Sequence, residues 1–357
     1  MVSGSSSQFP LHQVLLDWIA GQSIADRAFL AAQLLHDADR AAAFGITSAN
    51  VVSHLEQQLH WLRSSYAAID RFCRTTLGWT GCSIEWLWNV GLPIAMRLSH
   101  WRQLQEPCLI VGILGGQGTG KTTLSRILTE ILAVMGLCVG RLSIDDLYKT
   151  YAERQQLQQA DPRLRWRGPP GTHDVELGLS VLQQLRSVSP HQPVAIPRFD
   201  KSLWSGAGDR TDPEIVTKAD IVLFEGWFVG VRPIDPAAFD SAPPPIVTET
   251  DRAFARDIND RLRDYLPLWQ QLDRLVVLCP TDYRFSQQWR RQAEHQMIAA
   301  GRTGMTDAEI DEFVEYFWRS LHPELFIPPL LRDPRTDLVI ELSIDHQPLR
   351  IYHPISH

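Results

Sequence analysis

The feature that most constrains this chain is an apolar run that leads directly into a glycine-rich loop. Residues 109–123 read LIVGILGGQGTGKTT, and the residues that follow, LSRILTEILAVM, have the apolar spacing of a helix. Residues 115–122 fit the pattern G-x-x-x-x-G-K-[ST]. Because the pattern stands between a strand and a helix, it predicts a loop whose backbone N–H groups hold the phosphates of a nucleoside triphosphate.

Apolar runs of strand length continue after this loop and alternate with stretches of helical spacing. The runs are CLIVGIL, CVGRLSI, VAIP, ADIVLF, DRLVVLC and DLVIEL. Helices are expected near residues 121–136, 174–187, 252–272, 283–300 and 306–322, the last with a capping box of Thr306 and Glu309. Continuous apolar strands are typical of sheets covered on both faces. The prediction is an α/β fold of the P-loop NTPase type, with a doubly wound, mostly parallel sheet.

The first part of the chain has a different pattern. Residues 1–104 show helical apolar spacing and almost no strand-like runs, so we expect an all-helical N-terminal region before a kinase-sized domain at 105–357. The region holds half of the chain's 12 tryptophans. Aromatic residues at helical spacing are typical of a packed core, and no chemistry is assigned to them.

Composition excludes several classes of partner. The chain has 34 basic and 41 acidic residues, a net charge of −7, and no long run of one sign, which argues against nucleic acid or an anionic membrane as the main partner. Its 5 cysteines are scattered, without zinc-type spacing. The N-terminal residues lack a basic segment and a long apolar stretch. We expect a soluble cytoplasmic protein with a small-molecule substrate; the sequence does not predict its oligomeric state.

The loop itself supplies the expected nucleotide site. Lys121 would reach the β- and γ-phosphates of ATP, and the Thr122 hydroxyl would be a ligand of Mg²⁺. The residues expected to bind the nucleotide are Gly115, Gly116, Gln117, Gly118, Thr119, Gly120, Lys121, Thr122 and Thr123.

Carboxylates follow two of the expected strands, where ligands of open α/β sheets bind. Asp145 stands at the end of one strand and could take the proton of an attacking hydroxyl group, with Asp146 as a helix cap or supporting residue. Glu225 ends another strand, where a carboxylate helps to hold Mg²⁺. The alternatives, that the two aspartates only begin a helix and that Glu225 is a buried cap, stay open.

Arginines are concentrated on the expected helix after residue 283. Arg284, Arg290 and Arg291 could lie over the γ-phosphate, neutralise the charge that develops during transfer and exclude water. A solvated basic helix face is the alternative for each of them.

With these residues in place, the chain resembles the P-loop sugar and metabolite kinases related to phosphoribulokinase, uridine kinase and bacterial pantothenate kinase. Within that group it is most similar to the D-glycerate 3-kinases of the plant and cyanobacterial photorespiratory type. The stretches that carry the resemblance are GGQGTGKTT, SIDDLY, RGPPGTHD, PRFDKSLWSGAGDR, LFEGWFVG and, after the arginine-rich helix, AAGRTGMTDAEIDEF.

The resemblance implies that Asp145 is the catalytic base, that Lys121 and Thr122 serve phosphate and Mg²⁺, and that Arg290 or Arg291 belongs to a lid. It also implies that the acceptor binds between the polar stretches 161–174 and 197–210. Candidate acceptor residues are Arg198, Arg210, Arg167, Lys201, His173 and Asp174. Asp174 could equally be the N-cap of the following helix.

The implied activity is the Mg·ATP-dependent phosphorylation of D-glycerate on its 3-hydroxyl group. One alternative is a kinase of the same group acting on a nucleoside, pantothenate or a sugar phosphate. A second is a regulatory nucleotide-binding module whose helical N-terminal region engages a protein partner. Acidic residues after two strands favour chemistry over a regulatory switch.

Overall fold

The computed structural model describes residues 11–24, 27–105, 107–299 and 304–354, which fall into two compact units. One unit comprises the residues up to 104 together with 126–138, and the other comprises 105–125 and 139–357. The N-terminal unit therefore includes the second part of the helix that begins at the glycine-rich loop. The expected division of the chain into domains at 1–104 and 105–357 stays a prediction.

The N-terminal unit is helical, as the spacing of its apolar residues predicted. Its longest helix, α4, buries Leu55, Leu59, Leu62 and Ile69, which repeat at three, four and seven residues and so form one face. The helices are α1 (Leu11–Ile19), α2 (Arg27–His36), α3 (Ala38–Phe44), α4 (Val51–Thr75), α5 (Ile84–Trp86), the π-helix η1 (Leu87–Gly91) and α6 (Leu92–Gln103).

The larger unit is built on a six-stranded sheet in the order β2-β5-β1-β6-β7-β8. Its strands are β1 (Leu109–Gly115), β2 (Val139–Ser143), β5 (Ile221–Gly226), β6 (Arg274–Pro280), β7 (Leu338–Leu342) and β8 (Pro348–Tyr352). All pairs are parallel except β7 with β8. Every residue of β1 and β5 is buried, as expected for strands covered on both faces. The predicted α/β fold with a mostly parallel sheet is confirmed.

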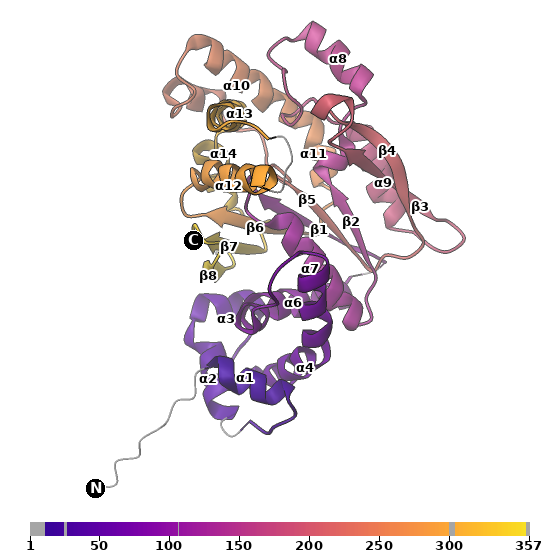
Figure 1. The fold of residues 1–357 in the computed structure, drawn as a ribbon, viewed down its shortest axis with the longest axis vertical. Helices are drawn as coiled ribbons and strands as arrows, with labels where there is room; N and C mark the ends of the chain where they lie inside the picture. The colour runs from indigo at the N-terminus through magenta and orange to yellow at the C-terminus, as the bar shows by residue number, and fades with distance from the viewer. Residues whose placement is uncertain (1–10, 25–26, 106, 300–303, 355–357) are drawn as a thin grey trace. The chain divides into compact units, whose positions relative to one another are not determined.

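The expected placement of the VAIP strand in this sheet is wrong. That run begins β3 (Val194–Asp200), which pairs antiparallel with β4 (Asp209–Val216) in a separate two-stranded ribbon (Figure 1). Val194 and Ile196 are buried whereas Ala195 between them is exposed, so only one face of the strand is covered. A one-sided strand suits a ribbon better than a sheet covered by helices. The stretch 197–210, expected to be a loop, consists of the ends of both strands and the turn between them.

Helices surround the sheet and connect its strands. They are α7 (Lys121–Val134), α8 (Tyr151–Ala160), α9 (Val175–Leu185), α10 (Glu249–Arg261), α11 (Leu266–Trp269), α12 (Phe285–Ala299), α13 (Asp307–Ser320) and α14 (Pro323–Leu330), with short 3₁₀ turns η2 (Ile144–Leu147), η3 (Trp204–Gly206), η4 (Pro236–Ser241) and η5 (Leu262–Tyr265). In Figure 1, α10, α13 and α12 lie in succession beside the sheet. The expected capping box of Thr306 and Glu309 is confirmed at the beginning of α13.

Two helices were not expected from the sequence. Helix α8 buries none of its residues, so its sequence has no apolar stripe that would reveal it. Helix α14 contains Pro328 and Pro329, which normally argue against a helix.

The core of the larger unit also fixes the loop 167–174. Phe228, Tyr265 and Trp269 pack together, with the Phe228 and Tyr265 ring centroids 5.1 Å apart. The buried Tyr265 hydroxyl accepts a hydrogen bond from the Gly171 backbone N–H at 2.9 Å and lies 2.8 Å from His173 Nδ1. Through Tyr265, the aromatic core thereby holds the polar loop 167–174 in place.

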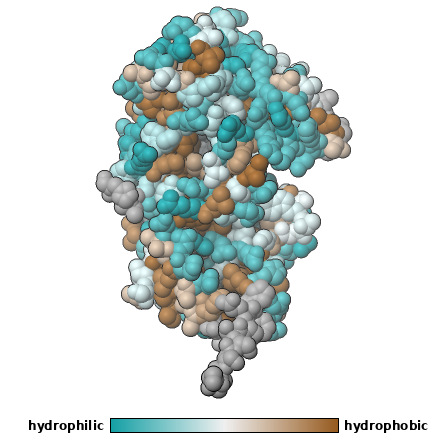
Figure 2. Space-filling view, turned by 90° about the vertical axis from the view of Figure 1, so that its left-hand side faces the viewer, coloured by the Kyte–Doolittle hydropathy of each residue, from teal (hydrophilic) through white to brown (hydrophobic). Residues whose placement is uncertain are grey.

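Polar residues predominate on the face shown in Figure 2, where hydrophobic residues occur in small groups between them. Among the residues that the structure describes, no helix has the length and apolar content needed to cross a lipid bilayer.

The one-sided burial of the β3–β4 ribbon can be tested by comparing the stability of two variants. Ile196 is fully buried, whereas Ile215 on the neighbouring strand is 61% exposed. We expect Ile196→Ala to lower the free energy of unfolding by about 2–5 kcal/mol and Ile215→Ala by less than about 0.5 kcal/mol, because only the first substitution leaves a cavity. Chemical denaturation of both variants measures the difference. Equal losses would contradict the one-sided ribbon.

Candidate active site

The glycine-rich loop lies between the end of β1 and the beginning of α7. Gly118 and Gly120 have φ values of 78° and 84°, a conformation that side chains disfavour. The Thr119 hydroxyl donates to the Gly116 carbonyl at 2.9 Å, and Lys121 Nζ lies 3.2 Å from the same oxygen. Burial lowers the pKa of Lys121, although Glu225 and Asp145 act in the opposite direction. The loop therefore has the curled backbone and the inward-facing cation that a phosphate site needs.

Two aromatic residues hold the tip of the loop. The Trp289 ring stacks on His346 with centroids 4.3 Å apart, and His346 Nε2 lies 2.7 Å from the Gly118 carbonyl oxygen. A side chain at Gly118 would come within 2.6 Å of Trp289. No sequence pattern indicates this contact, because long stretches of chain separate the two residues from the loop.

Thr122, in the first turn of α7, contacts Glu225 at the end of β5. The parallel register of β1 and β5 places Glu225 next to Ile113, and the Thr122 hydroxyl donates to Glu225 Oε1 at 2.6 Å. Glu225 is only 8% exposed. In the described part of the chain, no group of three or more His, Cys, Asp and Glu side chains could hold a metal ion alone. A hydroxyl and a carboxylate beside a phosphate loop fit Mg²⁺, which prefers few protein oxygens together with substrate phosphates.

Asp145 lies on η2, directly after β2. It accepts hydrogen bonds from the Tyr148 hydroxyl at 2.8 Å and from Lys201 Nζ at 2.6 Å. Burial opposes ionisation, but the Lys201 ammonium and these two hydrogen bonds hold the pKa of Asp145 down to about 2. Asp145 is therefore an ionised carboxylate in the protein as it stands.

Asp146 faces a different set of partners. Its carboxylate accepts a hydrogen bond from the Ser143 backbone N–H and pairs with Arg198, both at 3.0 Å. Burial raises the pKa of Asp146 against these contacts. The two adjacent aspartates thus have separate positions, with Asp146 as the cap of the turn that carries Asp145.

A cleft of about 1790 Å³ joins the glycine-rich loop to the polar stretches 161–174 and 197–210. Lys121, Thr122, Glu225 and Asp145 all line it. Of the six candidate acceptor residues, Lys201 and Arg167 line it as well. Arg167 donates through Nη1 to the carbonyls of Gly206 and Ala207 at 2.7 and 3.0 Å.

The other candidate acceptor residues lie outside the lining of this cleft. Arg198 bonds to Asp146, Glu214 and the Arg141 carbonyl, and so ties the ribbon to β2. Arg210 pairs with Asp174 at 2.8 Å. Asp174 also accepts from the Leu177 backbone N–H, as the N-cap that was its alternative role. Arg198, Arg210 and Asp174 therefore pair with other residues of the protein and stabilise the fold.

His173 is buried beneath Tyr148. The two rings stack with centroids 4.6 Å apart, and burial lowers the pKa of His173 to about 3 despite the nearby Asp145 charge. Its Nδ1 contacts Tyr265, and its Nε2 has no hydrogen-bond partner among the described residues. A neutral histidine in this position supports Tyr148, and through it Asp145.

The three arginines expected over the phosphates lie in three different environments. Arg290 lines the cleft and pairs with the buried Glu294. Arg291 points to α13, where it makes a two-nitrogen contact with Asp311. Arg284 pairs with Asp282 at 2.6 Å and is largely exposed. The similar stretch after this helix, 299–313, includes residues 300–303, which lie outside the described residues.

Arg154 is a cleft residue that the sequence did not indicate. It lies on the unexpected helix α8 and donates to the carbonyls of Lys149, Ala207 and Gly208. It thereby holds the turn of the β3–β4 ribbon against the cleft.

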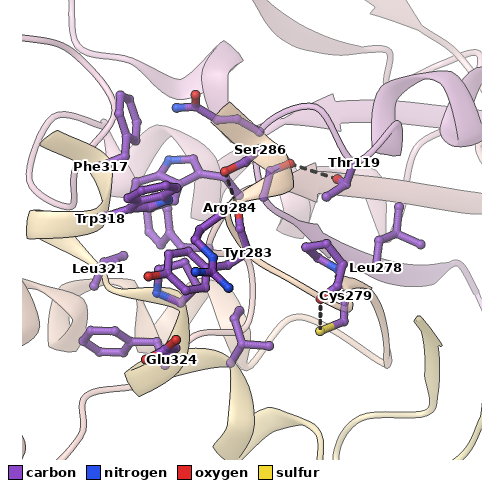
Figure 3. Close-up of a pocket in the computed structure, with 18 of the residues that line it drawn as sticks. Thr119, Leu278, Cys279, Tyr283, Arg284, Ser286, Phe317, Trp318, Leu321 and Glu324 are labelled. Carbon is purple, nitrogen blue, oxygen red and sulfur yellow. Dashed lines mark hydrogen bonds between the residues drawn. The ribbon is translucent and has the colours of Figure 1, made fainter. Parts of the chain in front are cut away.

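A second, smaller cavity of about 370 Å³ is lined in part by Gly116, Gln117 and Thr119 of the glycine-rich loop. Phe317, Trp318 and Leu321 line one side of it and Leu278 and Cys279 the other (Figure 3). The lining is mostly apolar, its Arg284 is paired with Asp282, and none of Lys121, Thr122 and Asp145 belongs to it. The polar cleft is therefore the candidate active site.

Comparison with known proteins agrees with this geometry. An uncharacterised kinase of Schizosaccharomyces pombe is 36% identical over 58% of this chain and 78% of its own length. The chloroplastic D-glycerate 3-kinase of Arabidopsis thaliana is 30% identical over 72% of this chain, which spans 57% of that protein. No protein-family model matches the chain.

A solved structure gives a similar result. D-glycerate 3-kinase from Cryptococcus neoformans superposes with a TM-score of 0.65 at 30% identity, and the match covers 72% of this chain and 94% of that one. The resemblance seen in the sequence motifs is thereby confirmed. This chain is an ATP-dependent kinase and belongs to the family of P-loop kinases that includes D-glycerate 3-kinase.

Proposed function

We propose that this kinase transfers the γ-phosphoryl group of ATP to the 3-hydroxyl group of D-glycerate, giving 3-phosphoglycerate and ADP. The observation that carries the proposal is the juxtaposition of Asp145 and Lys201 in the cleft that Lys121 also lines. A carboxylate suits an acceptor hydroxyl and an ammonium suits an acceptor carboxylate. The relatives named D-glycerate 3-kinase support the same acceptor.

In this proposal the chain acts mainly by positioning and by charge. Lys121 and the N–H groups of residues 115–123 bind the phosphates. Asp145 orients the 3-hydroxyl and accepts its proton as the oxygen bonds to the γ-phosphorus, while the bond to the ADP oxygen breaks. Arg290, which lines the cleft, would face the transferred group.

Thr122 and Glu225 are the residues that would hold Mg²⁺, directly or through water. When bound, the ion neutralises phosphate charge and orients the phosphate oxygens. The fit rests on the Thr122–Glu225 contact beside the loop.

The other acceptors considered from the sequence have less support. A sugar phosphate brings a dianion that needs several free cations. Arg198 and Arg210 are engaged with carboxylates of the fold instead. The cytoplasmic location and the photorespiratory role expected from the sequence stay predictions. The kinase relatives argue against the regulatory-module alternative.

The acceptor is tested directly by measuring ADP release with a panel of compounds. We expect D-glycerate to have a much higher kcat/KM than uridine, pantothenate or ribulose 5-phosphate, because it offers a hydroxyl and a single carboxylate. A higher kcat/KM for another acceptor would show that D-glycerate is not the substrate. If none of these compounds stimulates ADP release, the proposed acceptor is wrong.

The roles of Asp145 and Lys121 can be tested by substitution, with the neighbouring Asp146 as the control. We expect Asp145→Asn to lower kcat by roughly 10²- to 10⁴-fold and Lys121→Ala by roughly 10²- to 10³-fold. Asp146→Asn serves as the control, with lower stability and a kcat within a few-fold of the original, because Asp146 caps the turn. Near-normal kcat in Asp145→Asn would show that another group takes the proton.

The structure also separates the two arginines of the expected lid. Arg290→Ala should lower kcat on the order of 10²-fold, because Arg290 lines the cleft. Arg291→Ala should leave kcat almost unchanged, because that side chain is paired with Asp311. The reverse order in steady-state kinetics would show that α12 presents a different face to the nucleotide.

A further inference from the structure

The ion pair between Lys201 and Asp145 raises a question about the acceptor. Lys201 Nζ lies 2.6 Å from Asp145 Oδ2, and the Tyr148 hydroxyl occupies Asp145 Oδ1. Both oxygens of the proposed base are therefore already in contact with donors. An ammonium at this distance stabilises the carboxylate as an ion and reduces its tendency to accept a proton.

The two partners differ in how firmly they are held. Asp145 lies on a short 3₁₀ turn whose N-terminus is held by a capping box of Ser143 and Asp146. Lys201 lies in the turn of the β3–β4 ribbon, where residues 201–206 are all exposed. Its side chain is 58% exposed and ends a flexible four-carbon stem. Lys201 can change partner while Asp145 stays in place.

The other cations of the cleft have partners other than Asp145. Arg165 pairs with Glu312 and lies over the Trp166 ring. Arg154 is bonded through all three of its nitrogens to backbone carbonyls. Arg167 is bonded to two carbonyls of the same turn, and Arg290 to the buried Glu294. Lys121 lies against the Gly116 carbonyl in the phosphate loop. Lys201 is the cation of this set whose present partner is the proposed base itself.

We propose that the carboxylate of the acceptor takes the Lys201 ammonium away from Asp145, and that the acceptor hydroxyl takes the place of the ammonium on Asp145. The proposal rests on the proposed function and deepens it. D-Glycerate carries both groups on a three-carbon chain, so one molecule inserted into the ion pair leaves neither charge without a partner. A neutral acceptor offers hydroxyls only, and the ion pair then stays closed.

Lys201 is in this account a specificity residue that selects hydroxy acids by releasing the base. The charge balance makes the selection strong, because opening the pair without a replacement anion would leave an unpaired ammonium and an unpaired carboxylate next to the phosphate loop.

The test compares D-glycerate with its methyl ester, which keeps both hydroxyls and lacks the anionic carboxylate. For the unmodified kinase we expect kcat/KM to favour the acid strongly. In Lys201→Met the acid-to-ester ratio should fall on the order of 10- to 100-fold, the effect of losing one charge-assisted contact. Lys201→Arg should restore part of the preference. Lys218→Met is the control and should leave the ratio unchanged, since Lys218 is exposed and pairs with Asp220.

The pH dependence of kcat/KM with D-glycerate gives a second readout, for the case that ester turnover is too slow to measure. The charged and titratable groups that act on or near Asp145 are Lys201, Tyr148, Lys121, His173 and Asp146. Lys201 is the largest of the influences that lower the pKa of Asp145, so its removal should raise that pKa from about 2. Activity requires the ionised carboxylate, so the loss of activity on acidification should begin at higher pH in Lys201→Met.

The outcomes separate the two proposals. If neither the unmodified kinase nor any variant phosphorylates D-glycerate, the proposed function is wrong. If D-glycerate is phosphorylated but Lys201→Met keeps both the acid-to-ester ratio and the acidic limb of the original, the function stands and the exchange of partners at Lys201 is refuted.

Discussion

The site depends on the parallel pairing of β1 with β5. Because the two strands run in the same direction and in register, the glycine-rich loop after β1 and Glu225 at the end of β5 come out at the same edge of the sheet. The Thr122 hydroxyl then reaches Glu225 at 2.6 Å. The pairing of β2 with the other side of β5 brings Asp145 to this edge as well. Three segments far apart in the sequence thus supply a phosphate loop, a carboxylate fit for Mg²⁺ and a candidate base without any large excursion of the chain.

The polar half of the cleft is built differently, on a ribbon and loops outside the main sheet. The β3–β4 ribbon presents Lys201 at its turn, and Arg154 and Arg167 hold that turn through backbone carbonyls. The loop 167–174 is anchored by Tyr265, which belongs to the aromatic core. Rigid contacts therefore surround one exposed lysine. This contrast between fixed arginines and a movable lysine is the physical basis for assigning acceptor selection to Lys201.

The sequence predicted those elements that have a recognisable apolar periodicity or motif of their own. The buried strands β1 and β5 are uniformly apolar, and the loop at 115–122 has a specific spacing, so both were found. Helix α8 has no apolar face, and the pairing of β3 with β4 depends on a contact that periodicity does not encode. For the site, strand ends indicated Asp145 and Glu225. The division of the arginines could not be foreseen, because the carboxylates that pair with Arg198, Arg210 and Arg291 are brought near them only by the fold.

The central claim is that the cleft directs the terminal hydroxyl of a hydroxy acid to the γ-phosphate, with the carboxylate held at the opposite end. The position of the phosphate in the product measures this most directly. ³¹P and ¹H NMR of the material formed from D-glycerate and Mg·ATP should show 3-phosphoglycerate as the sole phosphorylated acid. Formation of 2-phosphoglycerate, of an acyl phosphate, or of inorganic phosphate alone would contradict the account.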